Sequence, residues 1–332
     1  MRKIRIAQIG TSLYSHGEGI FKNLRRFSDD FEVVGYALPE NEREKFPERM
    51  GVFGDLPELT VERILNDPTI DAVAVETEEV YLLKYAQMVA NAGKHIHMEK
   101  PGSQSLADFQ RLVATVKEKN LVFHIGYMYR YNPLVIDLLA QIQRGELGRL
   151  VSVEAQMSGN QEPELRQWLP TFKGGQMFYL GCHIIDLAYR ILGQPTQVLP
   201  LNVATGVDGI EGEDLCMAVL RYPNAIATVC TNALQRGGYL RRELVVTGSK
   251  KTVELRPIEM VCPGGQISTR TEYDAEEWFT PGVTTTTEKY LRYGTMLRSF
   301  AAMCRGEQKN PYTPDYELEL FKLILQCCGV EE

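Results

Sequence analysis

The sequence of 332 residues has no apolar run long enough to span a membrane and no excess of basic residues. A membrane-spanning helix needs about 20 consecutive apolar residues. A surface that binds nucleic acid needs a basic stripe, whereas this chain has a net charge of −7. The chain also starts without the long apolar core of a signal peptide. We therefore expect a cytoplasmic protein that has neither a membrane nor a nucleic acid as its partner.

The chain also lacks the cysteine spacing of a zinc site or of a disulfide framework. Its seven cysteines are an odd number, lie scattered along the chain and include no CxxC pair. That usage is typical of reduced thiols. The adjacent Cys327 and Cys328 fall in the last helical pattern, where burial is favoured over redox chemistry.

The order of the predicted elements indicates an α/β protein of two domains. The first 125 residues alternate between strands and helices, which predicts a doubly wound, Rossmann-like parallel sheet. From residue 150 onward, strand-like runs follow one another with a single helix among them, which predicts an α+β domain with an open, mostly antiparallel sheet. We therefore place a dinucleotide-binding domain at 1–125 and a substrate-binding domain at 126–332. Two helices, 288–305 and 315–328, are predicted to close the chain.

The loop after the first strand is a weak match to the dinucleotide fingerprint. The GxGxxG frame is filled by Gly10, Ser12 and Ser15, so only the first glycine is kept. Small residues can still admit a phosphate near the helix N-terminus, and the hydroxyl groups of Thr11 and the serines can donate hydrogen bonds to it. His16, in the same loop, is predicted either to cap the loop or to contact the cofactor.

The second strand lacks the acid that usually binds the adenosine ribose. Leu38 and Pro39 follow the strand, and Glu40 is the nearest carboxylate. The first basic residue is Arg43, too far along to mark a 2′-phosphate site. We therefore favour NAD as the cofactor, with NADP left open.

A charged pair follows the fourth strand, 95–98, and is stopped by a proline. Glu99 and Lys100 therefore lie at the carboxyl end of a strand, as Thr77 does after the third strand. Ligands of open α/β sheets bind at that edge, so Lys100 is a candidate catalytic cation and Thr77 and Glu99 are candidate cofactor contacts. The alternative is a surface Glu-Lys pair before a turn. His95 and His97 alternate on the strand and are predicted to pack inside the sheet.

Several motifs, in this order and spacing, resemble the Gfo/Idh/MocA oxidoreductases, the glucose-fructose oxidoreductase and inositol dehydrogenase group. They are Ala92-Gly93-Lys94-His95 leading into Glu99-Lys100-Pro101, the segment Tyr129-Arg130-Tyr131-Asn132-Pro133, and Gly145-Glu146-Leu147-Gly148. The resemblance implies a two-domain subunit whose second sheet covers the nicotinamide and commonly forms the oligomer contact. It thus implies a homo-dimer or homo-tetramer and a functional role for Lys100.

A predicted helix at 177–192 supplies the second half of the candidate site. Tyr179, His183 and Asp186 are spaced by four and three residues and share one stripe of this helix. The family has an Asp-x-Gly-x-His pattern here, so the resemblance implies a catalytic role for His183, with Tyr179 in place of the acid. A phenol has a pKa of about 10 and cannot replace the charge of a carboxylate. Asp186 is predicted either to orient His183 or to form a hydrogen bond with the helix backbone. His183 and Asp186 have no third ligand beside them in the sequence, so we do not predict a metal site.

Other polar residues are weaker candidates for substrate binding. Arg130 and Asn132 resemble residues that line the family's site, or else form a backbone-bonded turn before Pro133. Trp168 precedes the site helix and either covers a ligand or anchors a domain interface. Arg241 and Arg242 are predicted to form a solvated charge pair, with an anionic substrate as the alternative partner.

The resemblance implies hydride transfer between a nicotinamide cofactor and a hydroxyl carbon of a sugar, cyclitol or related polyol. His183 would accept the hydroxyl proton, and Lys100 would hold the oxygen. Two other functions stay open: a non-catalytic NAD or sugar sensor, and an NAD-dependent enzyme that cleaves glycosides without net redox change. The lost glycines, Leu38 and Tyr179 favour the sensor, whereas Lys100 and His183 favour the enzyme.

Overall fold

The computed structural model describes residues 2–330, which form two compact units. Unit 1 runs to Tyr127 and also takes in Tyr293–Phe321. Unit 2 comprises Met128–Arg292 and the chain from Lys322 onward. Two stretches that are far apart in the sequence therefore share each unit.

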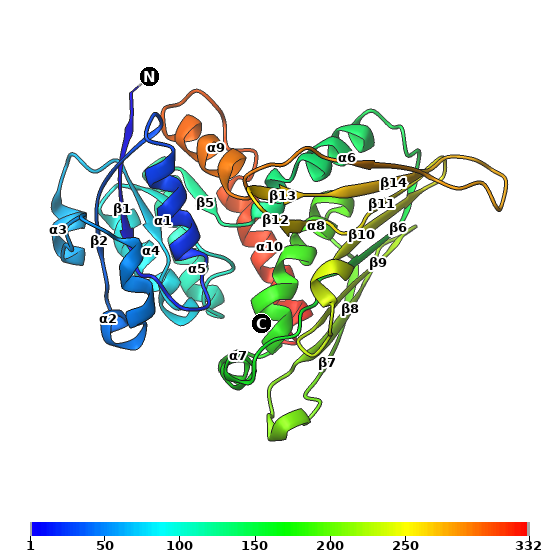
Figure 1. The fold of residues 1–332 in the computed structure, drawn as a ribbon, viewed down its shortest axis with the longest axis horizontal. Coiled ribbons are helices and arrows are strands. Elements are labelled where there is room, and N and C mark those ends of the chain that lie inside the picture. Colours follow the sequence, from blue (N-terminus) through cyan, green and yellow to red (C-terminus); the bar gives the residue numbers. More distant parts are fainter. Residues whose placement is uncertain (1, 331–332) are drawn as a thin grey trace. The chain divides into compact units, whose positions relative to one another are not determined.

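Unit 1 is built on a five-stranded parallel sheet of order β2-β1-β3-β4-β5 (Figure 1). Helix α1 packs beside α9, and α4 packs beside α5. The elements, in chain order, are β1 (Ile4–Ile9), α1 (Gly17–Arg26), β2 (Phe31–Ala37), α2 (Glu42–Lys45), α3 (Val61–Asn66), β3 (Ala72–Val75), α4 (Leu82–Asn91), β4 (His95–Met98), α5 (Leu106–Glu118), β5 (Phe123–Ile125) and α9 (Gly294–Cys304).

The strands of this sheet follow from their composition. A parallel strand that is covered on both faces reads as a continuous apolar run, and every residue of β3 is buried. The predicted parallel, Rossmann-like arrangement is confirmed. Helix α5 begins where the hydroxyl group of Ser105 accepts the amide of Asp108, a standard N-cap.

Unit 2 is built on an eight-stranded sheet of order β15-β14-β11-β10-β6-β9-β8-β7, in which the β6–β9 pair is parallel and the other pairs are antiparallel. Helix α8 packs against β6 and β9 on one face of this sheet (Figure 1). The elements are α6 (Pro133–Gln143), β6 (Leu150–Gln156), α7 (Pro163–Trp168), α8 (Cys182–Leu192), β7 (Gln197–Val203), β8 (Leu215–Arg221), β9 (Ile226–Asn232), β10 (Glu243–Gly248), β11 (Thr252–Leu255), β12 (Met260–Cys262), β13 (Gly265–Ile267), β14 (Thr269–Tyr273) and β15 (Val283–Thr286).

Short helical segments and a last helix complete the two units. Helix α10 (Pro314–Cys327) begins in unit 1 and ends in unit 2. A π-helical turn, Met177–Gly181, leads directly into α8. The 3-10 segments are Pro47–Val52, Glu79–Tyr81, Met128–Tyr131, Leu169–Thr171, Val207–Gly209 and Gly238–Arg241.

Two predictions about unit 2 and the last helices were wrong. The strands after residue 150 are separated by a second helix, α7, whose first residue is a proline in its favoured N-terminal position. The helix predicted at 288–305 begins at Gly294, because residues 287–290 are held extended by backbone hydrogen bonds to Gln266 and Ser268. The mostly antiparallel character of the sheet is confirmed.

Candidate active site

Lys100 lies at the carboxyl end of β4 and is 2% exposed. Its Nζ is 3.7 Å from Oε1 of Glu99, which is 1% exposed. The alternative of a surface Glu-Lys pair is therefore wrong. A buried ammonium placed on a rigid strand end is a pre-positioned cation rather than a solubilising charge.

The Glu99 carboxylate also binds the loop after β1. It accepts the backbone amide of His16 at 3.2 Å, and the Nδ1 atom of the His16 ring lies 3.0 Å from Oε2. Burial alone would raise the pKa of Glu99, but the His16 interactions together with Lys100 lower this pKa well below its usual range. Glu99 is therefore an anion that links the first loop to Lys100.

Two further acids at the same sheet edge are missing from the sequence-based site. Glu76, directly after β3, and Glu79 are both fully buried. Burial raises the pKa of Glu79 to about 8, and burial together with the nearby Glu99 carboxylate raises the pKa of Glu76. The run Glu76-Thr77-Glu78-Glu79 at the end of an apolar strand was the available signal. Perturbed acids of this kind mark candidate functional sites.

The two strand histidines pack within the sheet region, as predicted. His97 is buried, and its Nδ1 lies 2.7 Å from Nδ1 of His124 while its Nε2 lies 3.7 Å from Glu76 Oε1. Burial lowers the pKa of His97 to about 4, so this imidazole is neutral at pH 7. The ring of His95 accepts the backbone amide of Val122.

Most backbone amides of the loop from Gly10 to Gly17 have acceptors within the chain. The donor–acceptor pairs are Thr11 to Glu42 Oε2 (2.8 Å), Ser12 to Glu76 O (3.1 Å), Tyr14 to Ser12 Oγ (3.3 Å), Ser15 to Ser12 O (3.3 Å), His16 to Glu99 Oε2 (3.2 Å) and Gly17 to Ser15 Oγ (3.1 Å). A pyrophosphate is bound by such amides. The loop, folded in this way, does not fit that group.

Gly10 and Thr77 form one tight contact below this loop. Gly10 has a φ of 89°, and a Cβ atom there would lie 2.5 Å from the Thr77 backbone nitrogen. The glycine thus has a packing role that no other residue can fill. Ser12 and Thr11 are fully buried and Ser15 is 7% exposed.

The candidate ribose acid, Glu40, is engaged elsewhere in unit 1. Its carboxylate accepts the Tyr85 hydroxyl at 2.7 Å and the Lys84 ammonium at 2.5 Å. Hydrogen bonds from these two groups lower the pKa of Glu40. The carboxyl group beside the first loop belongs instead to Glu42, two residues further along.

His183 lies in unit 2 on α8 and is 1% exposed. The edge of its ring meets the ring of Tyr129, with centroids 5.3 Å apart. The Tyr129 hydroxyl accepts Arg242 Nη1 at 3.2 Å, and Arg242 itself is 8% exposed. The prediction of a solvated Arg242 is therefore wrong: the strand β10 that follows it carries this side chain into the interior.

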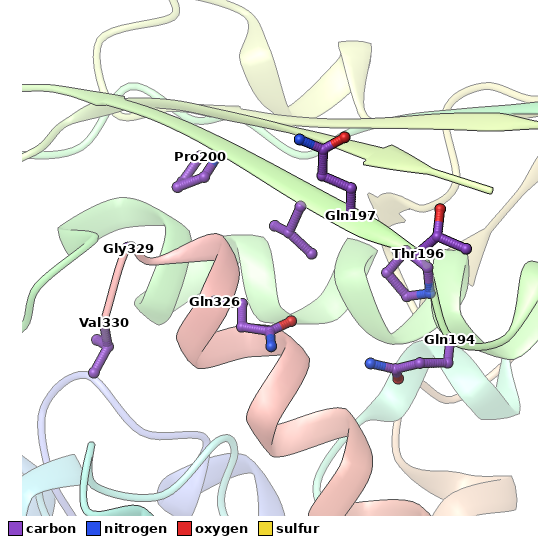
Figure 2. A pocket seen from close by; sticks show the side chains of 9 residues that line it. Gln194, Thr196, Gln197, Pro200, Gln326, Gly329 and Val330 are labelled. Atoms are coloured by element: carbon purple, nitrogen blue, oxygen red, sulfur yellow. The ribbon is translucent and has the colours of Figure 1, made fainter. Parts of the chain in front are cut away.

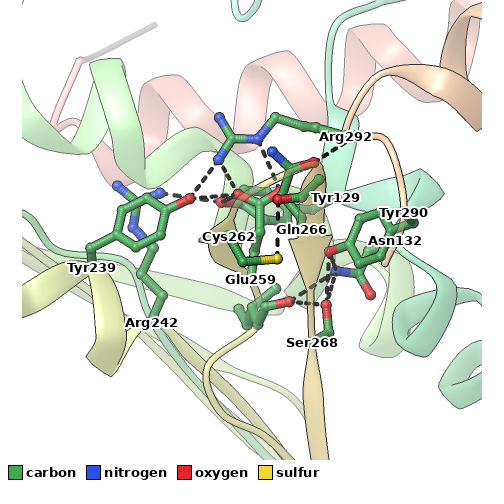
Figure 3. Close-up of polar contacts among 12 residues, drawn as sticks. Tyr129, Asn132, Tyr239, Arg242, Glu259, Cys262, Gln266, Ser268, Tyr290 and Arg292 are labelled. Carbon is green, nitrogen blue, oxygen red and sulfur yellow. Dashed lines mark hydrogen bonds and ion pairs between the residues drawn. The ribbon is translucent and has the colours of Figure 1, made fainter. Parts of the chain in front are cut away.

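A polar network continues from Tyr129 (Figure 3). Glu259 accepts the Tyr239 hydroxyl at 2.8 Å and Arg292 Nε at 2.9 Å. The guanidinium of Arg242 lies over the ring of Tyr239, 4.3 Å from its centroid. The aromatic neighbour of His183 is thus fixed by a set of satisfied polar groups.

The stripe residue Asp186 is paired with Arg130. The guanidinium Nε is 3.0 Å from both carboxylate oxygens and Nη2 is 2.7 Å from Oδ1, and both side chains are buried. Asn132 caps α6 by accepting the amides of Leu134 and Val135, and its own amide donates to the Ile258 carbonyl at 2.9 Å. These contacts give all three residues structural roles within unit 2.

Tyr179 and Trp168 lie together in unit 2. Their rings meet edge to face with centroids 5.5 Å apart, and Trp168 also contacts Phe172. Both are partly exposed, unlike His183. Tyr179 lies in the π-helical turn that precedes α8, and π-turns of this kind are frequent at functional sites.

A cavity of about 470 Å³ lies between the start of β7 and the end of α10 (Figure 2). The nine residues that line it are Gln194, Pro195, Thr196, Gln197, Val198, Pro200, Gln326, Gly329 and Val330. None of them is ionisable, so this cavity has no group for acid–base chemistry. Among residues 2–330, no group of His, Cys, Asp and Glu can hold a metal, and no helix is long and apolar enough to cross a membrane.

Comparison with known proteins agrees with this architecture. Residues 4–127 match the model of the oxidoreductase family with the NAD-binding Rossmann fold, and residues 136–254 match the GFO/IDH/MocA C-terminal domain. Those two ranges cover most of the chain. The protein belongs to the Gfo/Idh/MocA oxidoreductase family, as the motifs predicted.

Individual relatives are distant. The uncharacterised oxidoreductase YhhX of Escherichia coli is 28% identical over 57% of this chain and 54% of its own length. Myo-inositol 2-dehydrogenase of Thermotoga maritima is 25% identical over 74% of this chain and 72% of its own. The chain spans about half the length of the first curated relatives that it matches.

A solved structure of levoglucosan dehydrogenase, in complex with NADH and levoglucosan, has the same fold. Its TM-score is 0.79 at 18% identity, over 100% of this chain and 98% of that one. At this identity the likeness concerns the fold.

Proposed function

We propose that this protein catalyses hydride transfer between a nicotinamide cofactor and a hydroxyl carbon of a sugar, cyclitol or related polyol. The observation that carries the proposal is the buried Lys100 at the carboxyl end of β4, 3.7 Å from the Glu99 carboxylate. The family supports it, as do the relatives named for myo-inositol and levoglucosan.

In this proposal Lys100 holds the substrate oxygen. When hydride leaves a hydroxyl carbon, negative charge grows on the oxygen as the proton departs, and a pre-positioned ammonium stabilises that charge. The Glu99 carboxylate, 3.7 Å from the Lys100 ammonium, holds it in position. The chain thereby supplies orientation and electrostatics, and the nicotinamide supplies the redox chemistry when it is bound.

His183 accepts the hydroxyl proton in this proposal. An imidazole has a pKa near that needed for a general base at neutral pH. Tyr179 would add a hydrogen bond, and Trp168 would cover the substrate. Arg130, Asn132 and Asp186 line the substrate site in this proposal, and the hydrogen bonds that they make within unit 2 hold them in place.

NAD is the proposed cofactor, with NADP as the alternative. Gly10, Thr11, Ser12, Ser15 and Thr77 lie at the sheet edge that binds dinucleotides in this fold. The amides of that loop are engaged within the chain, so no step of the mechanism is derived through the cofactor. The same observation favours a second candidate function, a binding protein that has the fold without the chemistry.

The test compares wild-type protein with Lys100→Met. NADH appearance is followed with myo-inositol, levoglucosan and common aldoses. We expect turnover by the wild type and a loss of at least about 1,000-fold in kcat for Lys100→Met, because transition-state charge stabilisation is removed. Lys119→Met, an exposed lysine, serves as the control and keeps full activity. Unchanged turnover in Lys100→Met would contradict the assignment.

We also propose that the protein forms a homo-dimer or homo-tetramer through the open sheet of unit 2. The outer face of β7, β8 and β9 exposes large apolar side chains, namely Leu199, Leu201, Val203, Met217 and Ile226. Exposed apolar patches commonly mark such contacts. The molar mass measured by light scattering tests this, and a monomer would contradict it.

A further inference from the structure

Three backbone amides of the first loop of unit 1 have acceptors outside the loop: Ser12 donates to the Glu76 carbonyl, His16 to the Glu99 carboxylate and Thr11 to Glu42. Glu42 is 31 residues away from Thr11, yet its Oε2 accepts the Thr11 amide at 2.8 Å. The other acceptors come from within the loop or from the ends of β3 and β4. Glu42 is therefore the one acceptor that a movement of α2 would withdraw.

Burial of the Glu42 carboxyl group is energetically unfavourable. The residue is fully buried, so its carboxyl is removed from water. Burying a polar group is unfavourable unless hydrogen bonds within the protein replace those to water. Burial raises the pKa of this carboxyl to about 8, so the group is largely protonated at pH 7. The Glu42 carboxyl therefore blocks the Thr11 amide by accepting its hydrogen bond, and not by repelling an anionic ligand.

The backbone before Glu42 is also strained. Glu40 and Asn41 both have left-handed conformations, with φ of 58° and 59°. Residues other than glycine rarely adopt that region; asparagine tolerates it, whereas glutamate does not favour it. Both the conformation and the buried carboxyl oppose the closed arrangement, so α2 is held by contacts that a competing ligand can displace.

We propose that Glu42 is a gate on the dinucleotide site: its carboxyl occupies the Thr11 amide, and a dinucleotide binds only after α2 withdraws that carboxyl. This inference rests on the proposed function and names how its cofactor site is regulated. The pyrophosphate would then bind the amide that Glu42 releases, and the strain at Glu40 and Asn41 would be relieved. Binding and gate opening are thus one equilibrium.

A gate and a ribose-binding role for Glu42 predict opposite changes in cofactor affinity when this acid is removed. If Glu42 held the ribose hydroxyls, its removal would weaken binding. If Glu42 is a gate, its removal strengthens binding, because the apparent affinity rises with the fraction of molecules that are open. The two roles are therefore distinguished by the direction of a single change.

The test is a calorimetric titration of the full-length protein with NADH, and with NADPH in parallel. We expect Glu42→Ala to bind at least about tenfold more tightly than the wild type, as for a gate closed nine-tenths of the time or more. Glu42→Gln keeps an oxygen that can accept the Thr11 amide, so its affinity should stay within about threefold of the wild type. Glu44→Ala, exposed on the same helix, is the matched control and binds as the wild type does.

A measurement on the wild type covers the case in which a variant folds poorly. Amide hydrogen exchange is followed with and without NADH. We expect protection to rise in residues 11–17 and to fall in residues 39–46. Equal or weaker binding by Glu42→Ala, or rising protection in both segments, would overturn the gate.

The outcomes also separate the gate from the proposed function. Tighter NADH binding by Glu42→Ala without any polyol oxidation would support the gate and contradict the proposed dehydrogenase activity. Polyol oxidation by the wild type, together with weaker NADH binding by Glu42→Ala, would support the dehydrogenase activity and contradict the gate. If neither NADH nor NADPH binds to either protein, Glu42 is not the barrier and the gate is wrong.

Discussion

The buried acids of the two units differ in whether an arginine side chain pairs with them. In unit 2, Asp186 is paired with Arg130, Glu259 with Arg292, and Asp214 lies 3.6 Å from Arg166. In unit 1, no arginine in the described part of the chain pairs with Glu42, Glu76 or Glu79. A pair with an arginine is self-contained, whereas an uncompensated buried acid is costly and is retained where function requires it. In unit 1 the acids without such a partner follow β2 and β3 in the chain.

The largest effect on stability should come from breaking a compensated pair. Arg130→Met leaves the Asp186 carboxylate buried without its partner, which costs about 3–5 kcal/mol. Urea unfolding measures this loss. Arg63→Met, at an exposed position of α3, should change the free energy of unfolding by less than about 0.5 kcal/mol. If the two substitutions changed the free energy of unfolding equally, the Arg130–Asp186 pair would not have the stabilising role that we assign to it.

A smaller effect of opposite sign is expected in unit 1. The pKa of Glu79 is about 8 in the folded chain and about 4.3 when unfolded. The folded state therefore binds the extra proton, and the free energy of unfolding falls as the pH rises from about 4.3 to 8. At pH 9, Glu79→Gln removes this penalty, so it should stabilise the protein by about 2 kcal/mol or more.

The control for that prediction is an acid without a buried environment. Glu62→Gln, exposed on α3, should leave the pH dependence of stability unchanged. Urea unfolding of both variants at pH 6 and pH 9 provides the comparison. If Glu79→Gln were no more stable than the wild type at pH 9, the carboxyl would not be a buried, uncompensated acid.

The same contrast explains what could be predicted from the sequence. The strands of unit 1 are continuous apolar runs, and Lys100 directly follows one of them, so both the sheet and the position of the lysine follow from local pattern. The stripe of Tyr179, His183 and Asp186 was also placed on one helical segment, although its first turn is π-helical.

The partners of these residues could not be predicted, because they are distant in the sequence. Asp186 meets Arg130 across 56 positions, and Thr11 meets Glu42 across 31. The local pattern after the second strand points to Glu40, whereas the left-handed turn at Glu40 and Asn41 brings Glu42 to the loop instead. No local pattern encodes that turn, since neither residue is a glycine.

The most direct test of hydride transfer uses labelled substrate. The wild-type protein is incubated with NAD and with myo-inositol or levoglucosan deuterated at the hydroxyl-bearing carbons, and the NADH formed is examined by mass spectrometry. We predict NADH that carries one deuterium, because the hydride comes from the substrate carbon. Unlabelled NADH, or no NADH with any polyol or sugar of the panel, would contradict the proposed function.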